Sequence, residues 1–454
     1  MASDRSVAKD TWKAPTATGP LHATVSVPGS KSATNRAFVL AGLADQPAQV
    51  HAALDARDTR LMVGALGALG VRFEPIGSAQ SPDQSPPSRY PSGNADWLIT
   101  PPAIRPFPAG TVSVPVGLAG TVMRFLPPMA ALSEGTITID GDPRARQRPL
   151  GPMLDALADI GVDLKSSNGS LPIRINAHGH VAGGPVSIDA SASSQFISGL
   201  LLSAAAFEHG LELTHRGSRL PSMPHIDMTI AMLAEHGINV DQDLDRPAPR
   251  WIVQPGLIRA IDRVIEPDLS NAAPFLAAAM VCGGDVTVTH WPRRTTQAGD
   301  HLRDLFTQMG ASVTLGDEGL HVVGSSPIAG IEADMSLVGE LVPTIAALCA
   351  LADGPSHLYG INHLRGHETD RLAALAQMLN SLGGDVSETS DGITINPRPL
   401  HGGDVDSYDD HRMATAAAIV GLAVPGVTIS DIGTTDKTLP NFPQRWASLV
   451  ESTS

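Results

Sequence analysis

The feature that most constrains the fold of this chain is a repeat of about 75 residues. Five amphipathic, helix-like segments end in the same way, with a large apolar residue, three further residues, a glycine and then a strand-like run. A glycine just after a helix end commonly adopts the left-handed conformation that caps the helix. The five pairs are Leu66/Gly70, Leu157/Gly161, Leu233/Gly237, Phe306/Gly310 and Leu379/Gly383.

A second series of segments alternates with the first. Its members are apolar and alanine-rich on nearly every side, so we expect them to be buried helices, whereas the helices of the first series keep a polar face. They begin at Ser32, Gly120, Ser194, Asn271, Glu340 and Asp410. Short strand-like runs lie between the helices, such as Gly135–Asp140, Pro185–Asp189 and Val286–Thr289. The pattern predicts an α/β (α+β) fold built from about six copies of one unit.

Composition narrows the class of protein further. A chain of 454 residues with 42% hydrophobic residues is long enough for two or three domains. Its net charge of −15 argues against a general nucleic-acid or membrane surface. Cys282 and Cys349 lie in apolar helical segments, which excludes a disulfide scaffold and favours a reducing compartment. Without a signal-peptide core or a long apolar span, we expect a cytoplasmic protein.

The Ser/Pro/Gln-rich residues 77–96 predict a flexible surface insertion, to which we assign no function.

The stretch 27–43, VPGSKSATNRAFVLAGL, is the first candidate site. Pro28 and Gly29 end a strand-like run, and the Ser-Lys-Ser turn that follows opens a buried helix. Backbone N–H groups, hydroxyls, the Lys31 ammonium and the positive end of the helix dipole together suit a phosphate. Arg36 lies one helical turn after Ser32 and is placed to reach the same anion. An ordinary serine-capped helix remains an alternative, and the spacing of a nucleotide P-loop is missing.

Further stretches repeat this theme of a cation or hydroxyl at the start of a buried helix. Gly117–Arg124 lets a backbone amide at Gly120 approach a ligand, because glycine has no Cβ. Arg144–Pro149 places Arg148 just before a helix predicted to start at Leu150, with Pro149 at its first position. Ser191–Gln195 offers two adjacent hydroxyls and an amide, and Leu220–His225 presents Ser222 between prolines. The structural alternatives are helix capping for Gly117–Arg124, a solvated basic loop for Arg144–Pro149 and a simple turn for Leu220–His225.

The second half of the chain adds carboxylates and histidines. Asp334–Glu340 places Glu340 at the head of a helix, either as a cap or as a general base. His363–Arg371 holds His367, Glu368 and Arg371 at the start of an amphipathic helix; neighbouring arginines disfavour a metal ion there. Tyr408–Met413 predicts a helix start carrying Arg412, and Thr434–Pro440 predicts a loop carrying Lys437.

Taken together, these stretches resemble the EPSP synthase (3-phosphoshikimate 1-carboxyvinyltransferase) family of enolpyruvyl transferases. The motifs PGSKSATNRA, LAGTVMR, SSQF, HETDR, DDHRM and KTLPNF follow the family's order and spacing over nearly the whole chain. The resemblance implies two domains of three βαβαββ units each, one formed by 1–28 with 265–454 and the other by 29–264.

The resemblance also implies an activity: transfer of the enolpyruvyl group of phosphoenolpyruvate to the 5-hydroxyl of 3-phosphoshikimate, with release of phosphate. It implies a monomer that needs no metal or organic cofactor, with these two small molecules as partners and neither nucleic acid nor membrane. UDP-N-acetylglucosamine enolpyruvyl transferase shares the fold but uses a loop cysteine in its first half, where this chain has none. A non-catalytic anion-binding repeat protein is the alternative from another class.

Residues are carried over from the family position by position. The expected contacts to 3-phosphoshikimate are Lys31, Ser32, Arg36, Ser193, Ser194, Gln195, Ser222, Glu340 and His367. The expected contacts to phosphoenolpyruvate are Lys31, Gly120, Arg148, Gln195, Arg371, Arg412 and Lys437, with Arg124 in support. Glu340 aligns with the carboxylate base, Glu368 or Lys31 is the candidate proton donor, and His367 completes the catalytic set.

Three positions depart from the family pattern. Glu340 stands where Asp is frequent, His367 where Lys is common, and His225 where Tyr is usual. The reference pKa of histidine is about 6.5 against about 10.4 for lysine, so the change at His367 predicts a more acid-shifted pH profile than that of a lysine-bearing relative.

Overall fold

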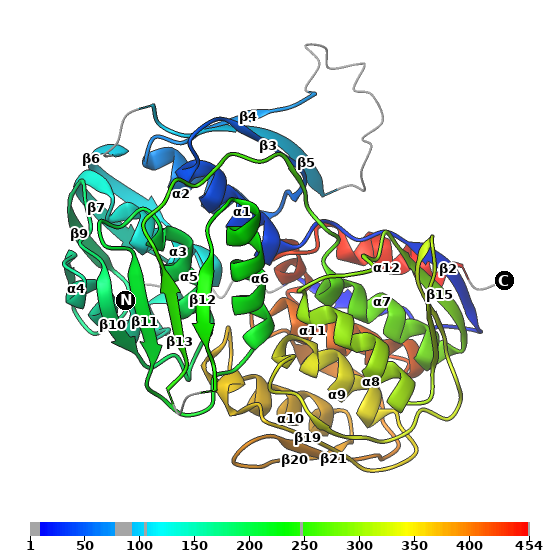
Figure 1. The fold of residues 1–454 in the computed structure, drawn as a ribbon. Helices are drawn as coiled ribbons and strands as arrows, with labels where there is room; N and C mark the ends of the chain where they lie inside the picture. The colour runs from blue at the N-terminus through cyan, green and yellow to red at the C-terminus, as the bar shows by residue number, and fades with distance from the viewer. Residues whose placement is uncertain (1–9, 78–92, 104–106, 246–247, 453–454) are drawn as a thin grey trace, which may run out of the picture. The chain divides into compact units, whose positions relative to one another are not determined.

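The computed structural model describes residues 10–77, 93–103, 107–245 and 248–452 (Figure 1). The chain forms two compact units. Unit 1 contains residues 1–27, 269–293 and 299–454, and unit 2 contains residues 28–268 and 294–298.

Within its described residues, unit 2 contains three four-stranded sheets that share one pattern, in which a parallel pair is followed by two antiparallel strands. The strand orders are β14–β3–β5–β4, β6–β7–β9–β8 and β10–β11–β13–β12. The first sheet comprises β3 (Ala48–Leu54), β4 (Arg72–Pro75), β5 (Asn94–Thr100) and β14 (Arg263–Val264). The second comprises β6 (Phe107–Pro115), β7 (Ser133–Asp140), β8 (Asp163–Ser166) and β9 (Ile173–His178). The third comprises β10 (Gly184–Ile188), β11 (Leu211–His215), β12 (Val240–Asp243) and β13 (Arg250–Val253).

Unit 1 repeats this pattern in two four-stranded sheets of its described residues, with orders β16–β17–β15–β2 and β18–β19–β21–β20. Its third sheet, β1–β23–β22, has three strands, a parallel pair and one antiparallel strand. The first sheet comprises β2 (Leu21–Val25), β15 (Gly284–Thr289), β16 (Ser312–Leu315) and β17 (Gly319–Val323). The second comprises β18 (Glu332–Asp334), β19 (Ser356–Tyr359), β20 (Asp385–Glu388) and β21 (Ile393–Asn396). The third comprises β1 (Thr11–Lys13), β22 (Gly403–Asp406) and β23 (Val427–Ser430).

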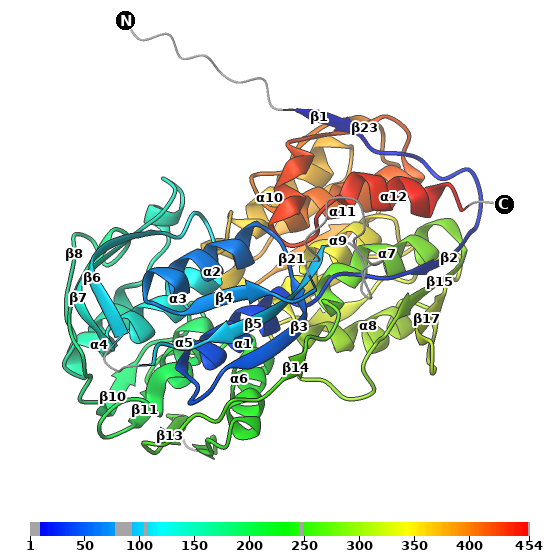
Figure 2. The same ribbon diagram turned by 90° about the horizontal axis from the view of Figure 1, so that it is seen from above.

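The first strands of the chain complete sheets formed by its second half. Strand β2 runs parallel to β15, with Leu21 opposite Gly284 and Val25 opposite Val288. Strand β1 pairs antiparallel with β23, and Figure 2 shows the two side by side. Two sheets of unit 1 therefore combine a strand from the start of the sequence with strands from its second half.

Two sets of helices accompany the sheets, a buried set and an outer set. The buried helices of unit 2 are α1 (Lys31–Leu43), α3 (Gly120–Ala130) and α5 (Gln195–Ala204), and those of unit 1 are α7 (Leu269–Cys282), α9 (Val342–Ala350) and α11 (His411–Ala423). Within each unit these three helices pack against one another in pairs. The outer helices are α2 (Arg57–Ala68), α4 (Gly151–Asp159), α6 (Met223–Glu235), α8 (Leu302–Gln308), α10 (Arg371–Ser381) and α12 (Phe442–Val450). The order β6–α3–β7–α4–β8–β9 is one complete βαβαββ unit, which confirms the predicted α/β class.

The five predicted glycine caps have a common geometry. All five glycines have positive φ, between 84° at Gly237 and 101° at Gly310. The Gly70 N–H donates to the carbonyl of Gly67, and the next N–H, of Val71, donates to that of Leu66. This pair of bonds is the Schellman motif, which satisfies carbonyls that the helix end leaves open. The same two bonds recur at Gly161, Gly237, Gly310 and Gly383, so the prediction is confirmed.

Three local predictions need correction. The predicted insertion 77–96 lies mostly outside the described residues, at 78–92, and its last residues, 94–96, begin strand β5 instead. Helix α4 starts at Gly151 rather than Leu150, so Pro149 precedes the helix, and the preceding residues Ala145–Gln147 form a 3-10 helix, η1. Lys437 ends the 3-10 helix η5 (Ile432–Lys437) rather than lying in an irregular loop. None of the described helices is long and apolar enough to cross a membrane.

Candidate active site

The start of helix α1 in unit 2 forms as the sequence predicted. Ser30 is the N-cap, and its hydroxyl accepts a hydrogen bond from the Ala33 N–H at 3.4 Å. Lys31 is the first helical residue; its backbone N–H donates to Asp268, and its Nζ lies 3.4 Å from Asp58 Oδ2. The Lys31 ammonium is therefore held by a buried carboxylate rather than extended into solvent.

Arg36, one turn further along α1, is buried and fully engaged by protein groups. Its Nε donates to Thr229 Oγ1 at 2.7 Å, its Nη1 to the Ser32 carbonyl at 2.9 Å, and its Nη2 to Ser198 Oγ and the His225 carbonyl. These bonds tie α1 to α5 and α6 and fix the backbone at Ser32. The role of Arg36 in this structure is to shape the turn, and its contact with a phosphate stays a prediction.

Gly120, Arg124 and Arg148 come together at the start of helix α3. Arg124 Nη1 donates to the Gly120 carbonyl at 3.1 Å, and Arg148 Nη1 donates to the Leu118 carbonyl at 3.3 Å. A Cβ at position 120 would lie 3.1 Å from Arg124 Nη1 and from both terminal nitrogens of Arg148. Both guanidinium groups therefore lie directly over the glycine.

The electrostatics of this group favour an anion. Burial, and next the positive charge of Arg148, lower the pKa of Arg124 well below its usual value. Among the described residues, Arg124 Nε has no hydrogen-bond partner, and the guanidinium packs over the Phe196 ring instead. Two close cations in a desolvated setting repel each other, and a bound anion would relieve that repulsion.

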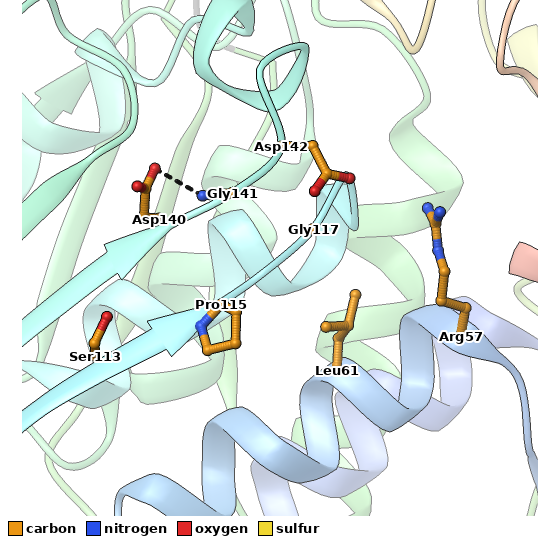
Figure 3. Close-up of a pocket in the computed structure, with 8 residues that line it drawn as sticks. All are labelled: Arg57, Leu61, Ser113, Pro115, Gly117, Asp140, Gly141 and Asp142. Carbon is orange, nitrogen blue, oxygen red and sulfur yellow. Dashed lines mark hydrogen bonds between the residues drawn. The ribbon is translucent and has the colours of Figure 1, made fainter. Parts of the chain in front are cut away.

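A hollow of about 590 Å³ is lined in part by Gly117, three residues before Gly120 in the sequence (Figure 3). It is at the ends of the parallel strands β6 and β7 and beside the start of α2. Figure 3 shows Arg57 and Leu61 on helix α2, with Asp140 and Asp142 across from them. Its lining residues are Arg57, Leu61, Ser113, Pro115, Gly117, Asp140, Gly141 and Asp142. None of them is a predicted site residue.

The hydroxyl and amide residues of unit 2 lie at the starts of helices α5 and α6. Ser193 Oγ accepts from the Gln195 N–H at 3.3 Å, and Ser194 is the buried N-cap of α5. The side-chain oxygen of Gln195 is buried and has no hydrogen-bond partner in the described residues, so it is available to a ligand. Ser222 has φ of 52° and makes no side-chain cap bond to α6. A left-handed serine is a strained conformation of the kind that clusters at binding sites.

In unit 1, Glu340 accepts hydrogen bonds from two residues, Ser270 and Arg412. It lies in a 3-10 helix, η3 (Gly339–Leu341), just before α9, not in the helix proper. Its Oε2 accepts from Ser270 Oγ at 2.9 Å and from Arg412 Nη2 at 3.2 Å, while Arg412 Nη1 donates to its carbonyl at 3.0 Å. The carboxylate is thus oriented by a hydroxyl and a cation, as a general base needs to be.

Arg371 and Lys437 are anchored by neighbouring carboxylates. Arg371 donates from Nε and Nη2 to the two oxygens of Asp410, at 2.7 and 3.2 Å, and its Nη1 lies 3.3 Å from His367 Nδ1. Lys437 Nζ donates to Glu368 at 3.1 Å. Burial, the largest influence, opposes the ionisation of Asp410, but the charges of Arg371 and His411 and the hydrogen bonds from Arg371 together keep the pKa of Asp410 below its usual value.

Glu368, Asp410 and His411 each offer a ligand atom, and these atoms lie within 4.8 Å of one another. The two carboxylates are nevertheless already paired with Lys437 and Arg371, whose charges oppose a metal ion. Burial lowers the pKa of His411, so its ring is neutral near pH 7. The group fits an ion-pair network better than a metal centre.

Sequence reasoning missed several partners of the predicted residues. Asp58 holds Lys31 and Ser270 holds Glu340, across 27 and 70 residues of sequence, and no local pattern marks either. His411 lies 3.5 Å from Glu368. Asp410 is the one of these partners that the sequence marks, because it is a carboxylate at a helix start. Its Oδ1 caps α11 by accepting a hydrogen bond from the Arg412 N–H.

Known proteins similar to this chain point to one family. The family model of EPSP synthase (3-phosphoshikimate 1-carboxyvinyltransferase) matches residues 15–446. The 3-phosphoshikimate 1-carboxyvinyltransferase of Kocuria rhizophila is 50% identical over 446 residues, covering 98% of this chain and 97% of the relative.

Solved structures show the same fold. EPSP synthase from Acinetobacter baumannii superposes with a TM-score of 0.75 at 23% identity, covering 97% of this chain and 98% of the other. The enolpyruvyl transferase NikO from Streptomyces tendae gives a TM-score of 0.70 at 17% identity with the same coverage. The match of one family model to nearly the whole sequence places this chain in the EPSP synthase family.

Proposed function

We propose that this chain is a 3-phosphoshikimate 1-carboxyvinyltransferase. It transfers the enolpyruvyl group of phosphoenolpyruvate to the 5-hydroxyl of 3-phosphoshikimate and releases phosphate, a step in the biosynthesis of aromatic amino acids. Family membership and the 50% identity to a relative of that name support this activity. The observation that carries the chemistry is Glu340, a carboxylate oriented by Ser270 and Arg412 in a unit that also buries Arg371 and Lys437.

We assign the binding of 3-phosphoshikimate mainly to unit 2. Lys31 and Ser32 lie at the start of α1, where N–H groups and the helix dipole favour a phosphate. Ser193, Ser194 and Ser222 add hydroxyl donors, and the unpartnered oxygen of Gln195 accepts from a substrate hydroxyl. The supporting feature is that these residues all stand at the starts of helices.

We assign phosphoenolpyruvate to the cationic residues. In unit 2 these are Arg148 and the amide of Gly120, and in unit 1 they are Arg371, Arg412 and Lys437. Lys31 and Gln195 contribute to this substrate as well. A dianionic phosphate and a carboxylate need this number of donors, because each charge is removed from water on binding.

The reaction needs one base and one acid. Glu340 takes the proton of the 5-hydroxyl as the hydroxyl oxygen attacks C2 of phosphoenolpyruvate, and His367 contributes on the 3-phosphoshikimate side. Glu368 or Lys31 delivers a proton to the methylene carbon, which gives a tetrahedral intermediate. Loss of phosphate and of one methyl proton then restores the double bond in the enolpyruvyl product.

The test is release of free phosphate from purified protein given both substrates. We expect release only when both are present, and Glu340→Gln should lower kcat by roughly 10²- to 10⁴-fold, the usual contribution of a general base. The matched control is Glu332→Gln, at an exposed glutamate of β18 in the same unit.

Two outcomes would redirect the proposal. Phosphate release with UDP-N-acetylglucosamine in place of 3-phosphoshikimate would assign the chain to the related transferase. Binding of both anions without turnover would make it a non-catalytic anion-binding protein. A cytoplasmic location and a monomeric state stay predictions from the sequence, and light scattering on the purified protein checks the second.

A further inference from the structure

The turn between β22 and α11 has an unusual backbone. Tyr408 and Asp409 are consecutive residues with positive φ, 55° and 54°. Non-glycine residues adopt this left-handed region infrequently and normally one at a time. The turn is held by two hydrogen bonds at its ends, from the Tyr408 N–H to Asp406 Oδ1 and from the Asp410 N–H to the Ser407 carbonyl, both 2.9 Å long. A strained backbone conformation that surrounding hydrogen bonds hold in place points to a functional constraint.

The left-handed turn directs one backbone carbonyl at a site residue. The Asp409 carbonyl accepts a hydrogen bond from Lys437 Nζ, although the Asp409 side chain itself is exposed. The next residue, Asp410, holds Arg371 through its carboxylate. Two cations predicted to bind phosphoenolpyruvate are thus anchored by adjacent residues, one through the backbone and one through the side chain.

A carbonyl is a suitable anchor for a cation that must still bind an anion. An ammonium group has three donors, of which the Asp409 carbonyl and Glu368 take two. The carbonyl is neutral, so it orients Lys437 without cancelling its charge. Lys437 already pairs with one carboxylate, Glu368, so a second carboxylate in place of the carbonyl would leave a net negative charge there and repel the incoming substrate.

We propose that the Tyr408–Asp409 turn is a positioning element for phosphoenolpyruvate, which acts by holding the Lys437 ammonium through the Asp409 carbonyl. This inference rests on the proposed function and extends it to a backbone feature. It implies that the conformation of residue 409 matters for the enzyme, whereas its side chain does not.

The experiment separates conformation from side chain. Asp409→Val introduces a β-branched residue that disfavours the left-handed region, and Asp409→Gly removes the same carboxylate but permits that region. His290→Val is the matched control, because His290 has φ of 60° and is an exposed residue directly after β15 in the same unit. Asp409→Ala serves in place of the valine variant if the latter does not fold.

We expect Asp409→Val and His290→Val to lower Tm by similar amounts. Only Asp409→Val should raise KM for phosphoenolpyruvate, by tenfold or more, with KM for 3-phosphoshikimate changed less than twofold. Asp409→Gly should recover most of that loss. An equal KM in both valine variants, or a glycine variant as impaired as the valine one, would overturn the inference.

A calorimetric titration with phosphoenolpyruvate gives a second readout that does not depend on turnover. If the parent protein releases no phosphate, the proposed function fails, but weaker binding by Asp409→Val than by His290→Val would still support the positioning role. Equal binding by these two variants would refute it.

Discussion

The close approach of Gly120 to Arg148 and Arg124 makes Gly120→Ala an informative substitution. The new Cβ would lie 3.1 Å from three guanidinium nitrogens, where ordinary contact begins at 3.4 Å. Both guanidiniums are anchored, Arg124 on the Gly120 carbonyl and Arg148 on the Leu118 carbonyl. The methyl group must therefore displace them by a few tenths of an ångström, away from the position in which they would hold an anion.

The expected change in KM follows from the hydrogen bond to phosphoenolpyruvate that the substitution weakens. A hydrogen bond to a charged group contributes about 1.5–3 kcal/mol, so the loss of one such bond to phosphoenolpyruvate raises its KM by about 10- to 150-fold. The substrate phosphate stays bound up to the transition state, so this is uniform binding and kcat should change less than KM. KM for 3-phosphoshikimate should stay within about twofold of the parent value.

Stability does not confound this test. Gly120 begins α3 and is not among the glycines with positive φ, so alanine is compatible with the backbone there. Steady-state kinetics with phosphoenolpyruvate varied, together with a thermal melt, is the assay. Gly64→Ala in α2 is the control, because a Cβ there meets nothing within 4 Å. A folded Gly120→Ala protein with an unchanged KM for phosphoenolpyruvate would refute the reasoning.

Two further substitutions probe buried charge. Asp410→Asn leaves Arg371 as a buried cation without its carboxylate, so urea melts should show a loss of about 3–5 kcal/mol in the free energy of unfolding; the additional change Arg371→Met should recover part of it, and a simply additive double variant would speak against the pairing. Burial, and next the charge of Arg371, lower the pKa of His363 to about 4. In the unfolded chain His363 takes up a proton near pH 6.5, whereas in the folded chain it does so only near pH 4. The free energy of unfolding therefore falls as the pH is lowered from about 6.5 to about 4, by on the order of 3 kcal/mol in full. His363→Gln should flatten that part of the plot of Tm against pH, and an unchanged slope between pH 6.5 and 5 would exclude His363 as a major contributor.

Much of the fold was readable from the sequence because its signals are local. A glycine four residues after Leu66 or Phe306 specifies a Schellman motif, and the structure contains that motif at all five predicted places. The buried helices were equally visible, since a segment that is apolar on every side has no stable place at the surface.

What the sequence could not supply depends on contacts between distant residues. No local pattern pairs Leu21 with Gly284, or places Asp58 beside Lys31 and Ser270 beside Glu340. The start of α4 was misjudged because two prolines, Pro149 and Pro152, compete for the first turn, and the second is the one inside the helix. The buried, fully bonded state of Arg36 was likewise hidden, because spacing along a helix gives a direction for a side chain but not its partners.

The pairing of β2 with β15 has a consequence for how the protein is made. His22 and Asp285, opposite each other in this pair, are 263 residues apart. At a synthesis rate of about 5–20 residues per second, β2 leaves the ribosome roughly 13 to 50 s before its partner strand exists. The residues of unit 2 are all but complete by then, so the nascent chain carries an unpaired amino-terminal strand while unit 2 folds behind it. A chaperone that shields short apolar segments would therefore have a window of this length in which to act on residues 21–25.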